Sequence, residues 1–129
     1  MREPLEVLVV EPHPGMRASL RGVLAVEDGV HVAGEATDVL SALRVAGRVH
    51  ADVAIVDDRA AALGAGGSAE GIGALARQLP VVVIGMGEPQ AYTRPYLEAG
   101  ASAYWCKTGE FDELVLLMRG AATAPPRAA

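Results

Sequence analysis

The order of strands and helices is decided first by the stretch LEVLVVEPHPGMRASL, residues 5–20, in which an apolar run gives way to a helical pattern. The run ends before Pro12, and its length and composition predict a short buried strand. Pro14 suits the first position of a helix, where its missing N–H is not needed. Apolar side chains then recur on one helical face, at Met16, Leu20, Val23 and Leu24. A strand therefore leads directly into a helix, with Glu11 at the junction.

The same alternation recurs along the chain. Further apolar runs predict strands at 30–33, 53–56, 81–84 and 103–106, and Asp57 follows the third strand directly. Helical spacing predicts a helix after each of them. Five strands alternating with five helices favour an α/β fold, in which a doubly wound, five-stranded parallel sheet is covered on both faces.

The helix boundaries are predicted from capping and breaking residues. We expect Asp38 to cap the second helix and Thr108 to cap the last one, because both side chains can accept a backbone hydrogen bond. Pro95 is expected to interrupt the fourth helix by kinking or shortening it. The inward positions are Val39, Leu43 and Ala46 in the second helix and Phe111, Leu114, Val115 and Met118 in the last.

Glycines dominate the segment after the third strand. They should loosen both a loop and the helix that follows, since each glycine inside a helix costs up to about 1 kcal/mol relative to alanine. We therefore expect a mobile loop and a short third helix through Leu75 and Leu79. The glycines are Gly64, Gly66, Gly67, Gly71 and Gly73.

Length and composition restrict the classes of function. A chain of 129 residues is most simply one domain, here residues 1–121, followed by a linker-like tail at 122–129, ATAPPRAA. The net charge is −5, Lys107 is the only lysine, and the arginines are scattered, so this segment is not expected to bind nucleic acid by itself. No apolar run approaches the roughly 18 residues of a membrane span. One cysteine cannot form an internal disulfide, which favours the cytoplasm.

Charged residues directly follow three of the five predicted strands: Glu11 the first, Asp57 and Asp58 the third, and Lys107 the fifth. Gly85 follows the fourth strand. Because the carboxyl ends of parallel strands meet at one edge of the sheet, where ligands bind in such folds, these side chains should converge. Two or more carboxylates beside an ammonium group are typical of a site for a phosphoryl group or a divalent metal.

Several stretches resemble one known family. VLVVEPHPGMRASLRGVL (7–24), ADVAIVDD (51–58) and EAGASAYWCK (98–107) are similar to the receiver domains of bacterial two-component response regulators. The resemblance covers residues 5–121 and implies a flavodoxin-like, CheY-like fold of five βα units. The HP after Glu11 and the GEA stretch most resemble the NarL/FixJ subgroup, whose receivers precede a helix-turn-helix DNA-binding domain. The resemblance therefore implies such a domain beyond the tail.

The resemblance also implies roles for individual residues. Asp57 matches the phosphoacceptor aspartate, and Lys107 matches the lysine that pairs with it and with the phosphoryl oxygens. Glu11 matches the first residue of the acidic pair. Tyr104 matches the aromatic switch position, which acts together with the residue at position 85.

Three positions depart from the family pattern. Pro12 stands where the second acidic residue directly ligates magnesium. Gly85 replaces the serine or threonine hydroxyl that hydrogen-bonds the phosphoryl group and couples it to the switch. Thr108 replaces the proline that follows the lysine. The chain therefore resembles a receiver whose metal pocket is incomplete, and weak or absent phosphorylation is expected.

Magnesium binding is expected to be weak or absent, and no other cofactor is expected. The ion prefers six oxygens in a tight octahedron and releases its waters reluctantly, so it depends on carboxylates already in place. Any ion held here would use Asp57, the carbonyl of Arg59 and Glu11 through water. Lys107 is then expected to form a structural ion pair with Asp57 or Glu11.

Neighbouring side chains leave some alternatives open. Arg59 either lies over the pocket and supplies positive charge in place of the metal, or is an ordinary exposed arginine. Asp58 is expected to point away from Asp57, because side chains alternate along a strand. For the same reason Tyr104 and Trp105 should lie on opposite faces of the sheet.

Three functional hypotheses follow. The first is an atypical, non-enzymatic receiver that controls a transcription factor, with a homodimer expected through the fourth helix, fifth strand and fifth helix. Its input is a histidine kinase or a small-molecule ligand, and DNA is contacted only through the domain beyond the tail. The second is a conventional receiver phosphorylated at Asp57 by a histidine kinase. The third is a flavodoxin-like cofactor binder or an aspartate-dependent phosphatase, although EPHPG (11–15) lacks a hydroxyl and Arg59 stands where a second acid is needed.

Overall fold

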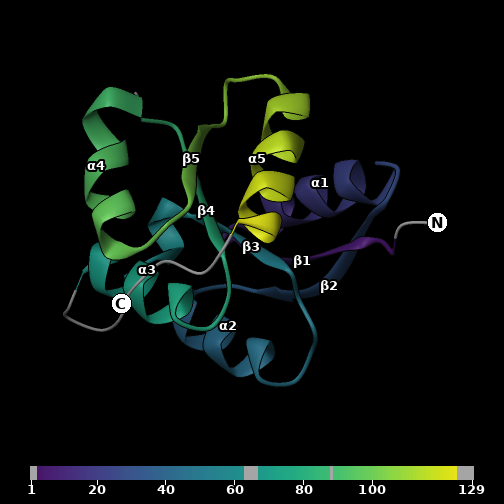
Figure 1. The fold of residues 1–129 in the computed structure, drawn as a ribbon, viewed down its shortest axis with the longest axis horizontal. Coiled ribbons are helices and arrows are strands. Elements are labelled where there is room, and N and C mark those ends of the chain that lie inside the picture. Colours follow the sequence, from purple (N-terminus) through teal and green to yellow (C-terminus); the bar gives the residue numbers. More distant parts are fainter. Residues whose placement is uncertain (1–2, 63–66, 88, 125–129) are drawn as a thin grey trace.

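The computed structural model describes residues 3–62, 67–87 and 89–124. One parallel sheet has the strand order β2-β1-β3-β4-β5, which confirms the predicted α/β fold (Figure 1). The strands are β1 (Leu5–Val10), β2 (Val30–Ala36), β3 (Val53–Asp57), β4 (Val81–Gly85) and β5 (Ala103–Cys106). The helices are α1 (Pro14–Ala25), α2 (Val39–Ala46), the 3₁₀ turn η1 (Asp58–Ala60), α3 (Ser68–Ala76), α4 (Pro89–Ala99) and α5 (Phe111–Thr123).

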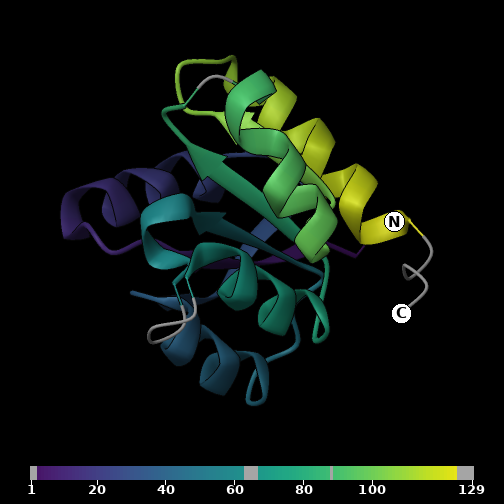
Figure 2. The same ribbon diagram turned by 90° about the vertical axis from the view of Figure 1, so that its left-hand side faces the viewer.

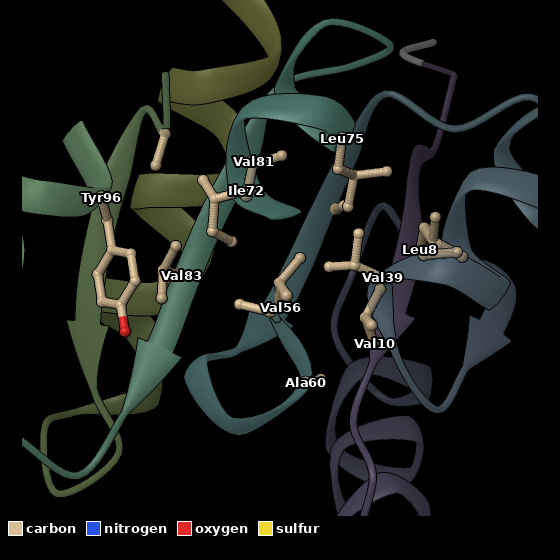
Figure 3. Close-up of a cluster of buried hydrophobic side chains, with 14 of the residues drawn as sticks. Leu8, Val10, Val39, Val56, Ala60, Ile72, Leu75, Val81, Val83 and Tyr96 are labelled. Carbon is tan, nitrogen blue, oxygen red and sulfur yellow. The ribbon is translucent and has the colours of Figure 1, made fainter. Parts of the chain in front are cut away.

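Helices cover both faces of the sheet, as doubly wound topology requires. α1 and α5 lie on one face, and α2, α3 and α4 lie on the other (Figures 1 and 2). Side chains of β1 alternate between the two resulting cores, since Leu8 and Val10 belong to one and Val7 and Val9 to the other. Figure 3 shows part of the α2–α3–α4 core, where Val56 and Val83 meet Ile72 and Tyr96. The central strands are buried on both faces, which explains why they read as continuous apolar runs.

Strand ends and helix caps differ from prediction in places. β2 continues to Ala36, and Asp38 caps α2 by accepting a 2.8 Å hydrogen bond from the Ser41 N–H, as predicted. The cap predicted at Thr108 is wrong: α5 starts at Phe111, and its N-cap Glu110 makes no side-chain capping bond. Acidic side chains in the first turn of α5 still favour its positive end.

Helix α4 continues through Pro95 to Ala99, so Pro95 does not end the helix. Tyr96, the next residue, is buried and stacks on Tyr104 with ring centroids 6.2 Å apart. Packing of this ring favours the helical path despite the backbone hydrogen bond that a proline lacks. The last helix likewise extends to Thr123, into the tail predicted from residue 122, and residues 125–129 lie outside the described ranges.

The predicted inward faces are only partly correct. Leu20 and Leu24 of α1 are buried, but Met16 and Val23 are 37% and 42% exposed, because α1 packs on the sheet along a narrower stripe. Leu79 is buried, although α3 ends before it at Ala76. The predicted mobile loop falls mainly on residues 63–66, which lie outside the described part of the chain. In that part, no helix is long and apolar enough to cross a membrane.

Gly71 has a packing role that the sequence did not indicate. A Cβ at this position of α3 would overlap the backbone carbonyl oxygen of Ala61, so the helix packs against the chain after η1 with no room for a side chain. Gly22 of α1 is the opposite case, with nothing within 4 Å of an added Cβ. Glycine is therefore required at position 71 by the close approach of the Ala61 backbone, but packing does not require it at position 22.

We predict that Gly71→Ala lowers the free energy of unfolding by at least about 3 kcal/mol, because the obstructing atom is backbone and cannot rotate away. Gly22→Ala should be neutral or stabilising by up to about 1 kcal/mol, since alanine favours an exposed helix position. Urea denaturation of both variants measures the difference. Equal stabilities would show that α3 can shift away from Ala61 at little cost.

Candidate functional site

The register of the sheet brings three charged residues to one edge. Val10 pairs with Val56, so Glu11 and Asp57 follow neighbouring strands at the same level. Gly85 pairs with Cys106, and the Lys107 N–H donates a 2.8 Å hydrogen bond to the Gly85 carbonyl. The predicted convergence of Glu11, Asp57 and Lys107 is therefore observed.

Lys107 lies between the two carboxylates. Its Nζ donates to Glu11 Oε1 at 3.0 Å and also to Asp57 Oδ2. The lysine side chain is 7% exposed, and both carboxylate side chains are fully buried. The predicted structural ion pair is thus formed with both acids.

Arg59 lies against Asp57, although its side chain is 61% exposed, so it has a feature of each alternative left open by the sequence. Its guanidinium binds Asp57 with two bonds, Nε to Oδ1 and Nη2 to Oδ2, both 3.1 Å long. Its backbone N–H adds a 2.8 Å bond to Oδ1, and its Nη2 lies 3.6 Å from Glu11 Oε2. The turn of η1 after β3 makes this possible, because Asp57 caps the turn and Arg59 folds back over it.

These contacts control the protonation of Asp57. Burial favours the neutral acid, but hydrogen bonds from Arg59 and Lys107 outweigh it and hold the pKa of Asp57 well below its usual range. The same contact raises the pKa of Arg59. Asp57 is therefore a carboxylate with both oxygens already engaged.

We call Glu11, Asp57, Arg59 and Lys107 the charge quartet. It contains two negative and two positive groups, so it is formally neutral. The remaining Glu11 oxygen, Oε2, also accepts a 3.1 Å bond from the His13 N–H. No buried side-chain nitrogen or oxygen in the described residues lacks a hydrogen-bond partner. Three members of the quartet are therefore buried and paired, while the fourth, Arg59, has a side chain that is 61% exposed.

The donor set does not fit magnesium. Pro12 offers no side-chain oxygen, and the carboxylate oxygens of Glu11 and Asp57 are bonded to cations or N–H groups of the chain itself. Within residues 3–62, 67–87 and 89–124, no group of three or more His, Cys, Asp or Glu side chains is arranged to hold a metal ion. An octahedral ion would need these oxygens free.

The predicted orientation of Asp58 is wrong. The strand ends at Asp57, so the alternation that would turn Asp58 away stops there, and Asp58 begins η1. Burial, together with the charge of the neighbouring Asp57, raises the pKa of Asp58. Asp58 and Asp57 line the same cavity, of about 410 Å³, with Met16, Arg59, Gly85, Met86, Gly87 and Lys107. A second acid directly after Asp57 was the sequence signal for this position.

Tyr104 and Trp105 lie on opposite faces of β5, as predicted. The Tyr104 ring is 8% exposed, and its hydroxyl donates a 3.1 Å hydrogen bond to the Gly87 carbonyl. Burial, with the nearby Asp58 charge, raises the pKa of Tyr104 to about 12. Trp105 Nε1 donates to the Glu110 carbonyl on the other face. The residue at the switch position is therefore directed inward.

Comparison with known proteins agrees with this architecture. The family model for the response regulator receiver domain matches residues 7–119. The transcriptional regulatory protein YhcZ of Bacillus subtilis is 31% identical over 117 residues, which cover 86% of this chain and 52% of that protein. The nitrate/nitrite response regulator NarP of Escherichia coli is 26% identical over 122 residues, or 92% of this chain and 55% of NarP.

Solved structures show the same fold. The signal receiver domain of NarL from Mycobacterium tuberculosis superposes with a TM-score of 0.81 at 25% identity, covering 96% of this chain and all of that domain. A LuxR-family response regulator from Aurantimonas sp. SI85-9A1 gives a TM-score of 0.80 at 24% identity, over 93% of this chain and 86% of the other. The chain spans about half the length of the curated relatives it matches. From the family match, the chain belongs to the receiver domain family of response regulators of two-component systems.

Proposed function

We propose that this receiver regulates a transcription factor without magnesium-dependent phosphorylation at Asp57. The observation that carries the proposal is the engagement of both Asp57 oxygens by Arg59 and Lys107. In aspartyl phosphorylation, a carboxylate oxygen forms a bond to phosphorus as the donor's bond breaks. An oxygen held by two cationic side chains must first leave them to react.

The neutrality of the charge quartet also opposes metal binding. Phosphoryl transfer relies on positioned cations that offset the charge of the transferring group, and magnesium supplies much of that charge. Here Arg59 already neutralises Asp57, so an incoming Mg²⁺ would meet two fixed cations and no free carboxylate pair. Displacing Arg59 alone does not supply an oxygen ligand at position 12, because Pro12 has no side-chain oxygen.

The wider role rests on the relatives. Both curated relatives are named as transcriptional or response regulators, and this chain matches about half of each. We therefore propose that the full protein carries a DNA-binding domain after residue 129 and that it acts in the cytoplasm. α4, β5 and α5 are proposed as its homodimer face, and a histidine kinase or small-molecule ligand as its input.

A conventional receiver remains the second candidate, because the Asp57–Lys107 pair of the family is retained. The two candidates differ in one measurable property. A conventional receiver accepts a phosphoryl group at Asp57 when magnesium is present, and the proposed one does not.

We predict that the protein acquires no phosphoryl group when it is incubated with acetyl phosphate and millimolar Mg²⁺ and followed by Phos-tag electrophoresis. We also predict that titration calorimetry detects no heat of Mg²⁺ binding. The double variant Pro12→Asp/Arg59→Ala should gain both, because it supplies the missing oxygen ligand and frees Asp57. Arg59→Ala alone should gain neither.

Asp57→Asn in the double-variant background is the control that assigns any phosphoryl group to Asp57. A stable, magnesium-dependent phosphoprotein formed by the unmodified chain and lost in Asp57→Asn would reject the proposal in favour of a conventional receiver.

A second prediction concerns the quartet itself. Lys107→Met should lower the free energy of unfolding at pH 7 by about 3 kcal/mol, since it leaves two buried carboxylates facing one cation. Adding Asp57→Asn should restore much of the lost free energy of unfolding, because Glu11 and Arg59 then leave the site with no net charge. Denaturation of the single and double variants gives the coupling energy between the two positions.

The effect of Lys107→Met should depend on pH with a definite sign. The lowered pKa of Asp57 contributes stability that is present above the ordinary aspartate pKa, about 4, and is lost as the pH falls below it. The difference between wild type and Lys107→Met should therefore shrink in acid. A difference that is constant from neutral pH to pH 3 would mean that lysine packing, and not its charge, stabilises the fold.

A further inference from the structure

The space beside Gly85 is filled by two side-chain oxygens from other parts of the chain. A Cβ at Gly85 would lie 2.7 Å from the hydroxyl of Tyr104 and 2.7 Å from Asp58 Oδ2. Both separations are well below ordinary van der Waals contact. A side chain at position 85 and the observed position of the Tyr104 hydroxyl therefore exclude each other.

We propose that Gly85 is a positioning residue that keeps Tyr104 inward whatever the state of Asp57. This goes beyond the proposed function, which concerns the chemistry of Asp57. The absence of a side chain at position 85 therefore does more than remove a hydroxyl group. It also creates the space that the Tyr104 hydroxyl occupies.

The inward ring connects three elements. Tyr104 belongs to β5, its hydroxyl bonds the carbonyl of Gly87 after β4, and its ring stacks on Tyr96 of α4 with an interplanar angle of 6°. Tyr96 in turn packs in the core that holds α2 and α3 (Figure 3). The position of one hydroxyl therefore bears on how α4 lies against the sheet.

The steric conflict between a side chain at position 85 and the Tyr104 hydroxyl can be tested in the folded protein. Both obstructing atoms are ends of side chains and not backbone, so an added methyl group displaces one of them without unfolding the domain. Asp58 begins the turn η1, next to the quartet. The Tyr104 hydroxyl is held by a hydrogen bond to the carbonyl of Gly87, which lines the same cavity, so we expect Tyr104 to yield.

The test compares Gly85→Ala with wild type by NMR of protein labelled in its tyrosine rings, with Tyr104→Phe to assign the Tyr104 signals. In wild type we expect an NOE between the rings of Tyr96 and Tyr104. In Gly85→Ala this NOE should be lost, and amide exchange at residues 93–99 of α4 should rise at least about tenfold. Gly22→Ala, whose Cβ meets nothing, should change neither.

Asp57→Asn separates this inference from the proposed function. If Gly85 alone positions Tyr104, Asp57→Asn keeps the ring NOE and the slow exchange of α4, whether or not Asp57 can be phosphorylated. The inference is overturned if Gly85→Ala keeps the NOE, because Asp58 has then moved instead. It is equally overturned if Asp57→Asn releases Tyr104, because the quartet then holds the ring.

Discussion

Two carboxylates fully buried at the carboxyl edge of the sheet impose the main constraint on this domain. Glu11 and Asp57 can remain charged there only with paired cations, because an unpaired buried charge costs several kcal/mol. Lys107 supplies one cation from the end of β5, the edge strand, and Arg59 supplies the other from the turn after β3. The quartet is therefore formally neutral. Its carboxylates are bonded to the chain's own side chains, while Asp57, Arg59 and Lys107 still line a cavity of about 410 Å³ together with Asp58.

This pairing of charges depends on the scaffold as well as on the residues. The parallel register puts Glu11 and Asp57 on adjacent strands at the same level, and the strand order brings β5 with Lys107 within reach through β4. The turn η1 then folds Arg59 back, so that its backbone and its guanidinium both bind one carboxylate. A bidentate guanidinium contact is strong and directional, which makes Arg59 an effective partner of Asp57.

Gly85, a second position that differs from the family pattern, changes the space available to neighbouring side chains. Gly85 leaves space that the Tyr104 hydroxyl and the Asp58 carboxylate both enter. The charge of Asp58 and the burial of the ring then raise the pKa of Tyr104 to about 12, so the phenol stays protonated and donates to the Gly87 carbonyl. Pro12 and Gly85 thus affect the same edge by different means: Pro12 offers no side-chain oxygen, and Gly85 admits neighbouring side chains.

The sequence by itself determined the alternation of strands and helices, the parallel sheet, and the meeting of Glu11, Asp57 and Lys107, because apolar periodicity and strand ends are local signals. It also placed a proline, which has no side-chain oxygen, at position 12. Only the tertiary structure decided that Arg59 binds Asp57, that Asp58 lines the same cavity, and that α4 continues through Pro95. Those outcomes depend on where a turn leads the chain and on contacts between distant elements. Local propensity carries no information about either.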